Sequence, residues 1–361
     1  MIFRMSKVTV IVPSFNHARF IEGTVASILQ QTHRDLELIV VDDCSSDDSV
    51  TLLRQFTGDP RFTLVPLSSN VGAGAAMNIG AERATGEFIA FCGSDDQFLS
   101  DKLEKQLAVF DNQSDLGVVF THIELIDENG RTYPDGSHPL HPIFKQANRS
   151  RGQWIHRFFY DGNCLCQPSA LIRRDLFEAV GRQDARLTQL HDFALWIRCV
   201  QRNPIHIIEA PLTRYRRSRH AVSLSDHGLA SNLRVRWESI AVLSLFLETS
   251  DTLAVDAFGA QYLTDRASLG ATTEQAIALA ATRQPHRWHQ FFGIQTLYES
   301  LRGMNRDAPS PQDTQMLAKL REISGQLDPM GLAASLAPPP AAPRVTFNWN
   351  SNAGAPRTTW R

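Results

Sequence analysis

The sequence predicts an α/β fold with an open, mostly parallel twisted sheet and helices on both faces. Two observations support this prediction. In the N-terminal third of the chain, short apolar runs alternate with helical patterns, which is the order of elements in a parallel sheet. The apolar runs are also nearly continuous, as in strands that are covered on both faces, rather than alternating in polarity.

Five strands are predicted from runs rich in Val, Ile, Leu and Phe. They cover Val8–Val12, Leu36–Val41, Phe62–Leu67, Phe88–Cys92 and Val118–Ile126. Between them, helical patterns cover Phe20–Gln31, Ser49–Phe56, Ala75–Ala84 and Lys102–Phe110. For the last of these helices Ser100 is a suitable N-cap, with Asp101 in the first turn.

The chain divides into three predicted parts. Residues 1–228 form one domain, which contains the sheet, every motif described below and a helix at Asp192–Val200 with one apolar face. Residues 229–327 form a helical extension without a site motif. Residues 328–361 have the Pro, Ala and Asn bias of a linker or disordered tail.

Charge and hydropathy exclude several classes of protein. The 36 basic and 38 acidic residues give a net charge of -2, which predicts no binding to nucleic acid or to an anionic membrane through overall charge. No apolar run approaches the ~20 residues of a membrane span, and the N-terminus lacks a signal-peptide cleavage site. The five cysteines lack paired metal-site spacing, so reduced thiols in the cytoplasm are expected.

Three polar segments follow predicted strands, namely PSFNH, DDCSSDDS and GSDDQ. In open α/β sheets, ligands bind beyond the carboxyl ends of the strands, so these segments are candidates for one binding site. Asp42 and Asp43 stand at a strand end and are expected to contact the ligand. Asp47 and Asp48 are expected to cap the helix that begins at Ser49 instead.

Other familiar sites do not fit these residues. No Gly precedes a Lys, which excludes a Walker A loop, and no two glycines are four apart, which excludes a nucleophile elbow. The segment from Asp43 is not an EF-hand loop, because Arg54 stands where a bidentate Glu is required. Gly72 and Gly74 begin a dinucleotide fingerprint, but Met77 replaces its third glycine, so an NAD-dependent oxidoreductase is a weak alternative.

Taken together, PSFN, the aspartates after the second strand, GSDD and QLHDFALW resemble the inverting family 2 glycosyltransferases of the GT-A fold, over about Lys7–Ser225. The resemblance implies an enzyme that moves a sugar from a nucleoside diphosphate sugar, expected to be a UDP-sugar, to an acceptor hydroxyl with inversion. The expected setting is the synthesis of bacterial surface glycans or glycoconjugates. The acceptor would be a glycan, a lipid-linked molecule or a protein, and the enzyme would work in the cytoplasm or at the periphery of the inner membrane.

The resemblance also assigns roles to individual residues. On the donor side, Phe15 would pack against the nucleobase beside Pro13, Asp43 would accept its ring N–H with Asp42 alongside, and Asp95 would face the ribose. Asp96 would bind Mn²⁺ or Mg²⁺ that bridges the two phosphates, and Asp192 would be the catalytic base. Diphosphate or metal contacts would come from Arg216, Arg219 and His220. Asn163, Pro168 and Ser169 would line the acceptor side.

Two positions depart from the family pattern, and each role has a structural alternative. Many members have Asp where this chain has Gly93, and often Glu where it has His191. Asp192 could be an ordinary first-turn acid on a helix, and the basic residues from Arg216 to His220 could form a solvated face. A module that binds nucleotide-sugar or glycan without turnover therefore stays open as an alternative to an enzyme.

We expect the chain after Asp328 to be dispensable for folding. Its composition offers little apolar surface to offset an ordering entropy of ~1–2 kcal/mol per residue. Limited proteolysis should therefore cleave this segment first and leave a fragment with an unchanged melting temperature. Protection of Pro338–Trp360 from protease would contradict the prediction.

Overall fold

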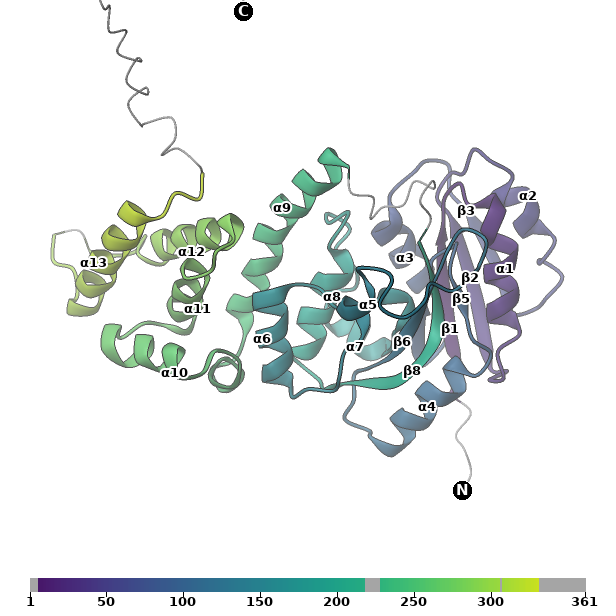
Figure 1. Ribbon diagram of the computed structural model, residues 1–361, viewed down its shortest axis with the longest axis horizontal. Coiled ribbons are helices and arrows are strands. Elements are labelled where there is room, and N and C mark those ends of the chain that lie inside the picture. The colour runs from purple at the N-terminus through teal and green to yellow at the C-terminus, as the bar shows by residue number, and fades with distance from the viewer. Residues whose placement is uncertain (1–5, 218–227, 306, 331–361) are drawn as a thin grey trace, which may run out of the picture.

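The computed structural model describes residues 6–217, 228–305 and 307–330. Its centre is an eight-stranded sheet in the order β3-β2-β1-β4-β7-β6-β8-β5 (Figure 1). The strands are β1 Val8–Ser14, β2 Leu36–Asp42, β3 Phe62–Pro66, β4 Phe88–Phe91, β5 Gln97–Phe98, β6 Val118–Ile126, β7 Leu171–Arg173 and β8 Ile205–Arg216.

The sheet is parallel in its first half and mixed in its second half. Strand β1 lies parallel to both β2 and β4, and β3 extends this half beyond β2. Strand β7 runs antiparallel to β4 and β6, and β5 runs antiparallel to β8. The predicted mostly parallel α/β sheet is thus confirmed. Strands β5, β7 and β8 were not predicted, because β5 and β7 are very short and the apolar pattern of β8 is interrupted by Pro211 and by charged residues.

Thirteen α-helices surround or extend this sheet within the described residues. They are α1 Ala18–Leu29, α2 Ser49–Arg54, α3 Ala73–Ala81, α4 Lys102–Asn112, α5 His141–Phe144, α6 Arg151–Asp161, α7 Arg174–Ala179, α8 His191–Val200, α9 Leu229–Leu243, α10 Asp251–Leu269, α11 Thr273–Thr282, α12 Arg287–Ser300 and α13 Pro311–Gln326.

The predicted N-cap of α4 is wrong. Helix α4 begins after Asp101, which occupies the N-cap position without a side-chain capping bond. The carboxylate of Asp101 pairs with Lys105 instead, at 2.6 Å. Ser100 lies outside the helix, where its carbonyl accepts the Thr32 N–H at 2.8 Å. Ser100 is thus hydrogen-bonded to the segment that follows α1, one residue before the N-cap position of α4.

Alternate residues of β1 explain why helices cover both faces of the sheet. Val8, Val10 and Val12 belong to one buried cluster with apolar residues of α1 and α4. Ile11 belongs to another cluster, with residues of α3, α6, α7 and α8. Successive side chains of a strand point to opposite faces, so a strand that is apolar throughout requires a helical layer on each side.

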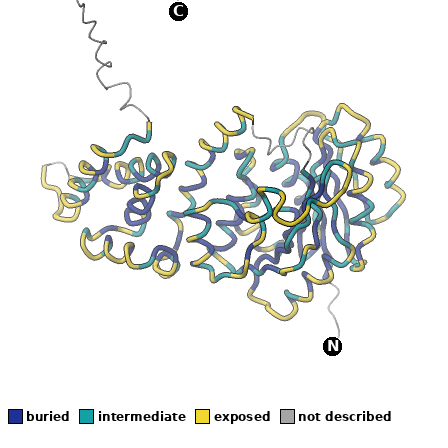
Figure 2. The backbone as a smooth tube through the Cα atoms, in the orientation of Figure 1, coloured by how far each residue is buried: buried dark blue, intermediate teal, exposed yellow. Residues whose placement is uncertain are grey.

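The C-terminal helices continue the second of these clusters instead of forming a separate core. Figure 1 shows α10–α13 beyond α6 and α9, on the side remote from β1–β3. Phe159 of α6 packs edge-on against Phe246, Phe258 and His289, with ring centroids 5.0–5.4 Å apart. Figure 2 shows buried chain on both sides of this junction. The boundary after residue 228 stays a prediction, and the packing across it is continuous.

None of the helices in the described ranges combines the length and the apolar character that crossing a membrane requires.

Replacement of Trp196 tests how firmly α8 is joined to the sheet. Its indole is 1% exposed and meets Phe120 of β6 edge-on at 4.8 Å. We expect Trp196→Ala to lower the free energy of unfolding by about 3–5 kcal/mol, because it removes a large buried ring and leaves a cavity. Trp237→Ala is the matched control in urea unfolding, because Trp237 is 70% exposed, and its cost should stay within about 0.5 kcal/mol. An equal loss of unfolding free energy in the two variants would contradict the packing of Trp196 described here.

Candidate active site

A cavity of about 650 Å³ lies at the carboxyl ends of β1 and β4, in the size range of small-molecule sites. It brings together segments that are far apart in the sequence. Its lining includes residues of the loops after β1, β2 and β4, the segment 163–168, the start of α8, the end of β8 and the first turns of α9.

Most of the predicted site residues line this cavity. Those that do are Pro13, Phe15, Asp43, Asp95, Asp96, Asp192 and Arg216. Asn163 and Pro168, expected on the acceptor side, also line it, whereas Ser169 is buried and is not part of the lining. Arg219 and His220 lie outside the described residues.

The loop after β1 presents Phe15 at the cavity with 45% of its surface exposed. The next residue, Asn16, has a left-handed φ of 53°, a conformation that Asn tolerates better than most residues. Its side-chain oxygen accepts the Ser46 N–H at 2.8 Å, and its own N–H donates to Ser45 Oγ at 2.9 Å. The loops after β1 and β2 are therefore joined, which fixes the backbone beside Phe15.

Asp42 shapes the loop after β2 and does not reach the cavity, contrary to the prediction that it contacts the nucleotide. It is 1% exposed. Its carboxylate accepts the Ser45 N–H at 2.9 Å and the Ser45 hydroxyl at 2.7 Å. Between them Cys44 has a φ of 65°, an uncommon conformation for a residue with a side chain, and these two hydrogen bonds hold the turn in place.

Asp43 lies in the cavity wall and holds the loop that leads into α3. Its two carboxylate oxygens accept the N–H groups of Val71 and Gly72, at 2.6 and 2.9 Å. Gly72 has a φ of 87°, which only glycine adopts without strain. Since each carboxylate oxygen has two acceptor sites, Asp43 retains the capacity to accept one more hydrogen bond from a ligand.

The predicted capping role of Asp47 is confirmed. One of its oxygens accepts the Ser49 N–H at 3.0 Å, at the start of α2. The other accepts the Ala18 N–H at 2.9 Å, at the start of α1. Asp48 occupies the N-cap position of α2 but makes no side-chain capping bond, so its predicted capping role is wrong.

The GSDD turn after β4 is held by a side chain of α1. The Thr24 hydroxyl approaches the carbonyls of Ser94 and Asp96 at 3.0 and 2.7 Å. Gly93 is closely approached by both carboxylates: a Cβ atom there would lie 2.5 Å from an oxygen of Asp96 and 3.0 Å from one of Asp95, so these side chains would have to shift. The departure from the family pattern at this position thus leaves space that the two carboxylates occupy.

Asp96 is a buried carboxylate, 2% exposed, that accepts the main-chain N–H of Arg216 at 2.8 Å. Burial, and then repulsion from Asp95, raise the pKa of Asp96 well above its usual range, while the Arg216 N–H and nearby arginines oppose the shift. An ionised Asp96 in this position is therefore electrostatically unfavourable until a cation approaches.

The Arg216 side chain is committed largely to the protein itself. It donates to the carbonyls of Asp95 and Asp127, both at 2.7 Å, and its guanidinium lies 4.6 Å from the ring centroid of Phe20. It is 7% exposed. Arg216 is therefore better placed to hold the Asp95–Asp96 turn than to bind a diphosphate.

The residues present fit a sparsely held divalent cation. Within the described ranges no three His, Cys, Asp or Glu side chains form a metal-binding group. Asp96 lines the cavity beside Asp95. Mg²⁺ and Mn²⁺ are commonly held by one or two carboxylates, with substrate phosphates and water completing the coordination shell.

Asp192, the second residue of α8, lines the cavity. One oxygen accepts the Asn163 side-chain N–H at 3.0 Å, and the other accepts the Phe193 main-chain N–H at 2.6 Å. Burial raises the pKa of Asp192, and the neighbouring His191 partly opposes this. A raised pKa makes a carboxylate a stronger base once it is ionised. Burial also lowers the pKa of His191, whose Nδ1 lies 3.1 Å from Gln183 Oε1.

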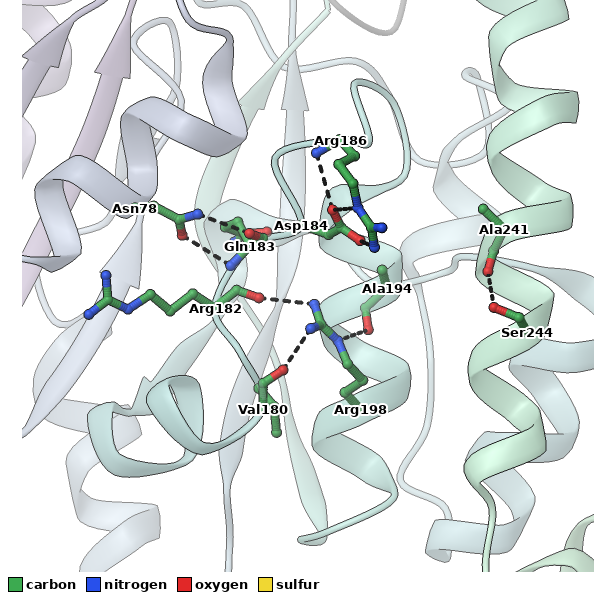
Figure 3. A network of polar contacts seen from close by, with 10 residues as sticks. All are labelled: Asn78, Val180, Arg182, Gln183, Asp184, Arg186, Ala194, Arg198, Ala241 and Ser244. Carbon is green, nitrogen blue, oxygen red and sulfur yellow. Dashed lines mark hydrogen bonds and ion pairs between the residues drawn. The ribbon is translucent and has the colours of Figure 1, made fainter.

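The loop that leads into α8 is held at its first half by two side chains (Figure 3). The Asn78 amide forms hydrogen bonds with both the N–H and the carbonyl of Gln183, at 3.1 and 2.9 Å. Arg198 of α8 donates to the carbonyls of Val180 and Arg182, at 2.6 and 2.9 Å. The loop is thus fastened to α3 on one side and to α8 on the other.

The sequence reasoning missed several residues of this site. Arg217 and Arg234 line the cavity and carry positive charge that suits an anionic ligand. The Gln167 side chain lines it too, and its Nε2 is buried without a hydrogen-bond partner in the described structure. Arg217 stood within the basic segment already noted. No sequence signal pointed to Arg234, which lies in a helix without a motif.

Comparison with known proteins agrees with the family resemblance. The sequence model of Glycosyl transferase family 2 matches residues 9–181. TuaG of Bacillus subtilis (strain 168), a glycosyltransferase named for teichuronic acid biosynthesis, is 44% identical over 124 residues, which are 34% of this chain and 49% of TuaG. An uncharacterized glycosyltransferase of Nostoc sp. is 36% identical over 178 residues, or 48% of this chain and 53% of the relative. The chain spans about half the length of these relatives.

Solved structures share the fold at low sequence identity. Residues 1–349 of S. aureus TarS, solved in complex with UDP, match with a TM-score of 0.56 at 16% identity, covering 88% of this chain and 90% of that one. The mannosyltransferase PcManGT of Pyrobaculum calidifontis, solved with GDP-Man and Mn²⁺, gives 0.50 at 18%, covering 88% and 80%. We conclude that residues 9–181 of this chain belong to a glycosyl transferase family 2 domain and that the chain has the GT-A fold.

Proposed function

We propose that this protein transfers a sugar from a UDP-sugar to an acceptor hydroxyl with inversion, in the synthesis of a bacterial surface glycan or glycoconjugate. The observation that carries the proposal is the convergence of Asp43, Asp96 and Asp192, from three distant segments, on one cavity. The choice of UDP draws on TarS, which was solved with UDP and with UDP-GlcNAc.

In the proposed mechanism, Asp192 removes the proton from the acceptor hydroxyl. The acceptor oxygen then attacks the anomeric carbon from the face opposite the diphosphate, the bond from that carbon to the phosphate oxygen breaks, and UDP leaves with the electron pair. The hydrogen bond from Asn163 fixes the orientation of the Asp192 carboxylate. A single displacement of this kind inverts the configuration of the anomeric carbon.

On the donor side, the half-exposed ring of Phe15 would stack against the nucleobase, and Asp43 would accept a hydrogen bond from it. Asp95 would accept hydrogen bonds from ribose hydroxyls. Arg217 and Arg234, which also line the cavity, are our candidates for diphosphate contacts in addition to Arg219 and His220.

Asp96 is the proposed ligand of Mn²⁺ or Mg²⁺, with Asp95 beside it. When bound, such a cation supplies Lewis-acid stabilisation of the departing diphosphate. Its charge also favours the ionised form of Asp96, which burial and Asp95 otherwise disfavour.

The acceptor we propose is a glycan, a lipid-linked molecule or a protein, reached in the cytoplasm or at the periphery of the inner membrane. A screen of nucleotide-sugars by thermal stabilisation, with and without Mn²⁺, tests the donor side. A transfer assay on the nucleotide-sugars that stabilise the protein then separates an enzyme from a module that binds its ligand without turnover.

Asp96→Asn should separate the metal site from the fold. The amide oxygen can still accept the Arg216 N–H, and the buried charge disappears, so we expect the ligand-free variant to melt at the same or a higher temperature than wild type. The additional stabilisation that Mn²⁺ gives to the UDP complex should be lost. Asp101→Asn, at an ion pair outside the cavity, is the control. Wild-type Mn²⁺ stabilisation in Asp96→Asn would refute the assignment.

Asp192→Asn should abolish the basic group while keeping the shape of the side chain and one of its two hydrogen bonds. We expect transfer to slow by ~10²–10⁴ and calorimetry to give an unchanged affinity for UDP. Because the pKa of Asp192 is raised, wild-type activity should increase with pH through a midpoint above the ordinary aspartate value of about 4. The residual activity of the variant should lack this increase. Transfer by Asp192→Asn at nearly the wild-type rate would show that another residue is the base.

A further inference from the structure

One carboxylate of the C-terminal helices binds the second half of the loop that precedes Asp192. Glu238 of α9 is 7% exposed. Its carboxylate accepts the main-chain N–H groups of Thr188, Gln189 and Leu190, at 2.9, 2.8 and 2.9 Å. Thr188 and Glu238 are 50 residues apart in the sequence. A side chain beyond the predicted catalytic domain therefore completes the loop at the active site.

The three amides that Glu238 accepts are next to the proposed base. Leu190 is the N-cap residue of α8, and Asp192 is the second residue of that helix. Thr188, Gln189 and Asp192 all line the cavity. A displacement of the loop at residues 188–190 would therefore move the start of α8, and with it the Asp192 carboxylate.

A carboxylate suits this position better than any neutral side chain. The N–H groups before and within the first turn of a helix have no partners inside the helix, and the helix dipole favours negative charge there. Two carboxylate oxygens offer about four acceptor sites, of which three are used. A glutamine in the same place would bring an N–H donor against one of these donors.

Helix α9 is itself held so that Glu238 points at this loop. Val242 and Leu243, near its end, are buried in the cluster that covers the sheet. Ser231 and Arg234, about two turns and one turn before Glu238, line the cavity, as expected for residues on the same side of a helix. Figure 1 shows α9 standing between the sheet and the C-terminal helices.

The other side-chain contacts of the loop lie at different residues from those that Glu238 holds. Asn78 and Arg198 hold the loop at residues 180–183 (Figure 3), and Asp184 pairs with Arg186 within the loop itself. Among the hydrogen bonds described here, Glu238 is the side chain that holds the amides of residues 188–190.

We propose that Glu238 is a positioning residue for sugar transfer, which fixes the start of α8 so that Asp192 faces the acceptor hydroxyl. This inference rests on the proposed function, because it assigns Glu238 a role through Asp192. It makes α9 a part of the catalytic unit and not an appendage of it.

Kinetics and amide exchange of Glu238→Gln and Glu238→Ala test this proposal in the full chain. We expect kcat to fall roughly tenfold to a hundredfold, as for a misplaced catalytic group, while the KM for the donor and the affinity for UDP change little. Glu238→Asp keeps the charge on a shorter side chain and should recover part of the kcat lost in Glu238→Ala. Hydrogen exchange should become faster at residues 188–190 and stay unchanged in β1.

The matched control is Glu37→Gln. Glu37 is a partly buried carboxylate of β2 that accepts the Thr85 N–H and pairs with Lys7, outside the residues that line the cavity. We expect this variant to lose stability and to keep the wild-type kcat. Suppose that Asp192→Asn is inactive, but Glu238→Ala keeps the wild-type kcat and the wild-type hydrogen exchange at residues 188–190. This result would overturn the role of Glu238 alone. Wild-type activity in Asp192→Asn would overturn the base assignment and this proposal together.

Discussion

The buried Asp96 carboxylate constrains the structure around it, because its charge must be compensated. A buried ionisable group is unfavourable unless donors or a cation compensate it, and here the donor comes from the main chain of Arg216 at the end of β8. The Thr24 hydroxyl of α1 fixes the same turn through its carbonyls. Strands β4 and β8 and helix α1 are thereby set relative to one another at the cavity. The site thus lies where β4 of the parallel half and β8 of the mixed half are connected by these hydrogen bonds.

The acid-rich loop after β2 shows how few of its acids are available to a ligand. Asp42 holds its own turn, and Asp47 holds the starts of α1 and α2. Asp43 holds the backbone before α3 and still faces the cavity. Main-chain N–H groups at strand ends and helix starts need acceptors, and short carboxylates supply them. These hydrogen bonds hold the loop after β2 in place, and those from Asn16 join it to the loop that carries Phe15.

The C-terminal helices belong to the site as well as to the core. The aromatic cluster around Phe159 joins α6 to α10 and α12, and α9 contributes both cavity-lining residues and the carboxylate of Glu238. The proposed site therefore depends in part on helices in which no motif is visible.

The sequence by itself determined the α/β class, the strands of the parallel half and the polar strand ends that meet at the cavity, because apolar periodicity and polar strand ends are local patterns. Within these polar strand ends, the family resemblance pointed to Phe15, Asp43 and Asp96. Tertiary structure alone decided which acids face the cavity, since Asp42 differs from Asp43 only in the direction of its side chain. It also decided the course of β8, the position of Arg216 and the part taken by Glu238. These depend on hydrogen bonds between segments far apart in the chain, and no local pattern of residues encodes such a bond.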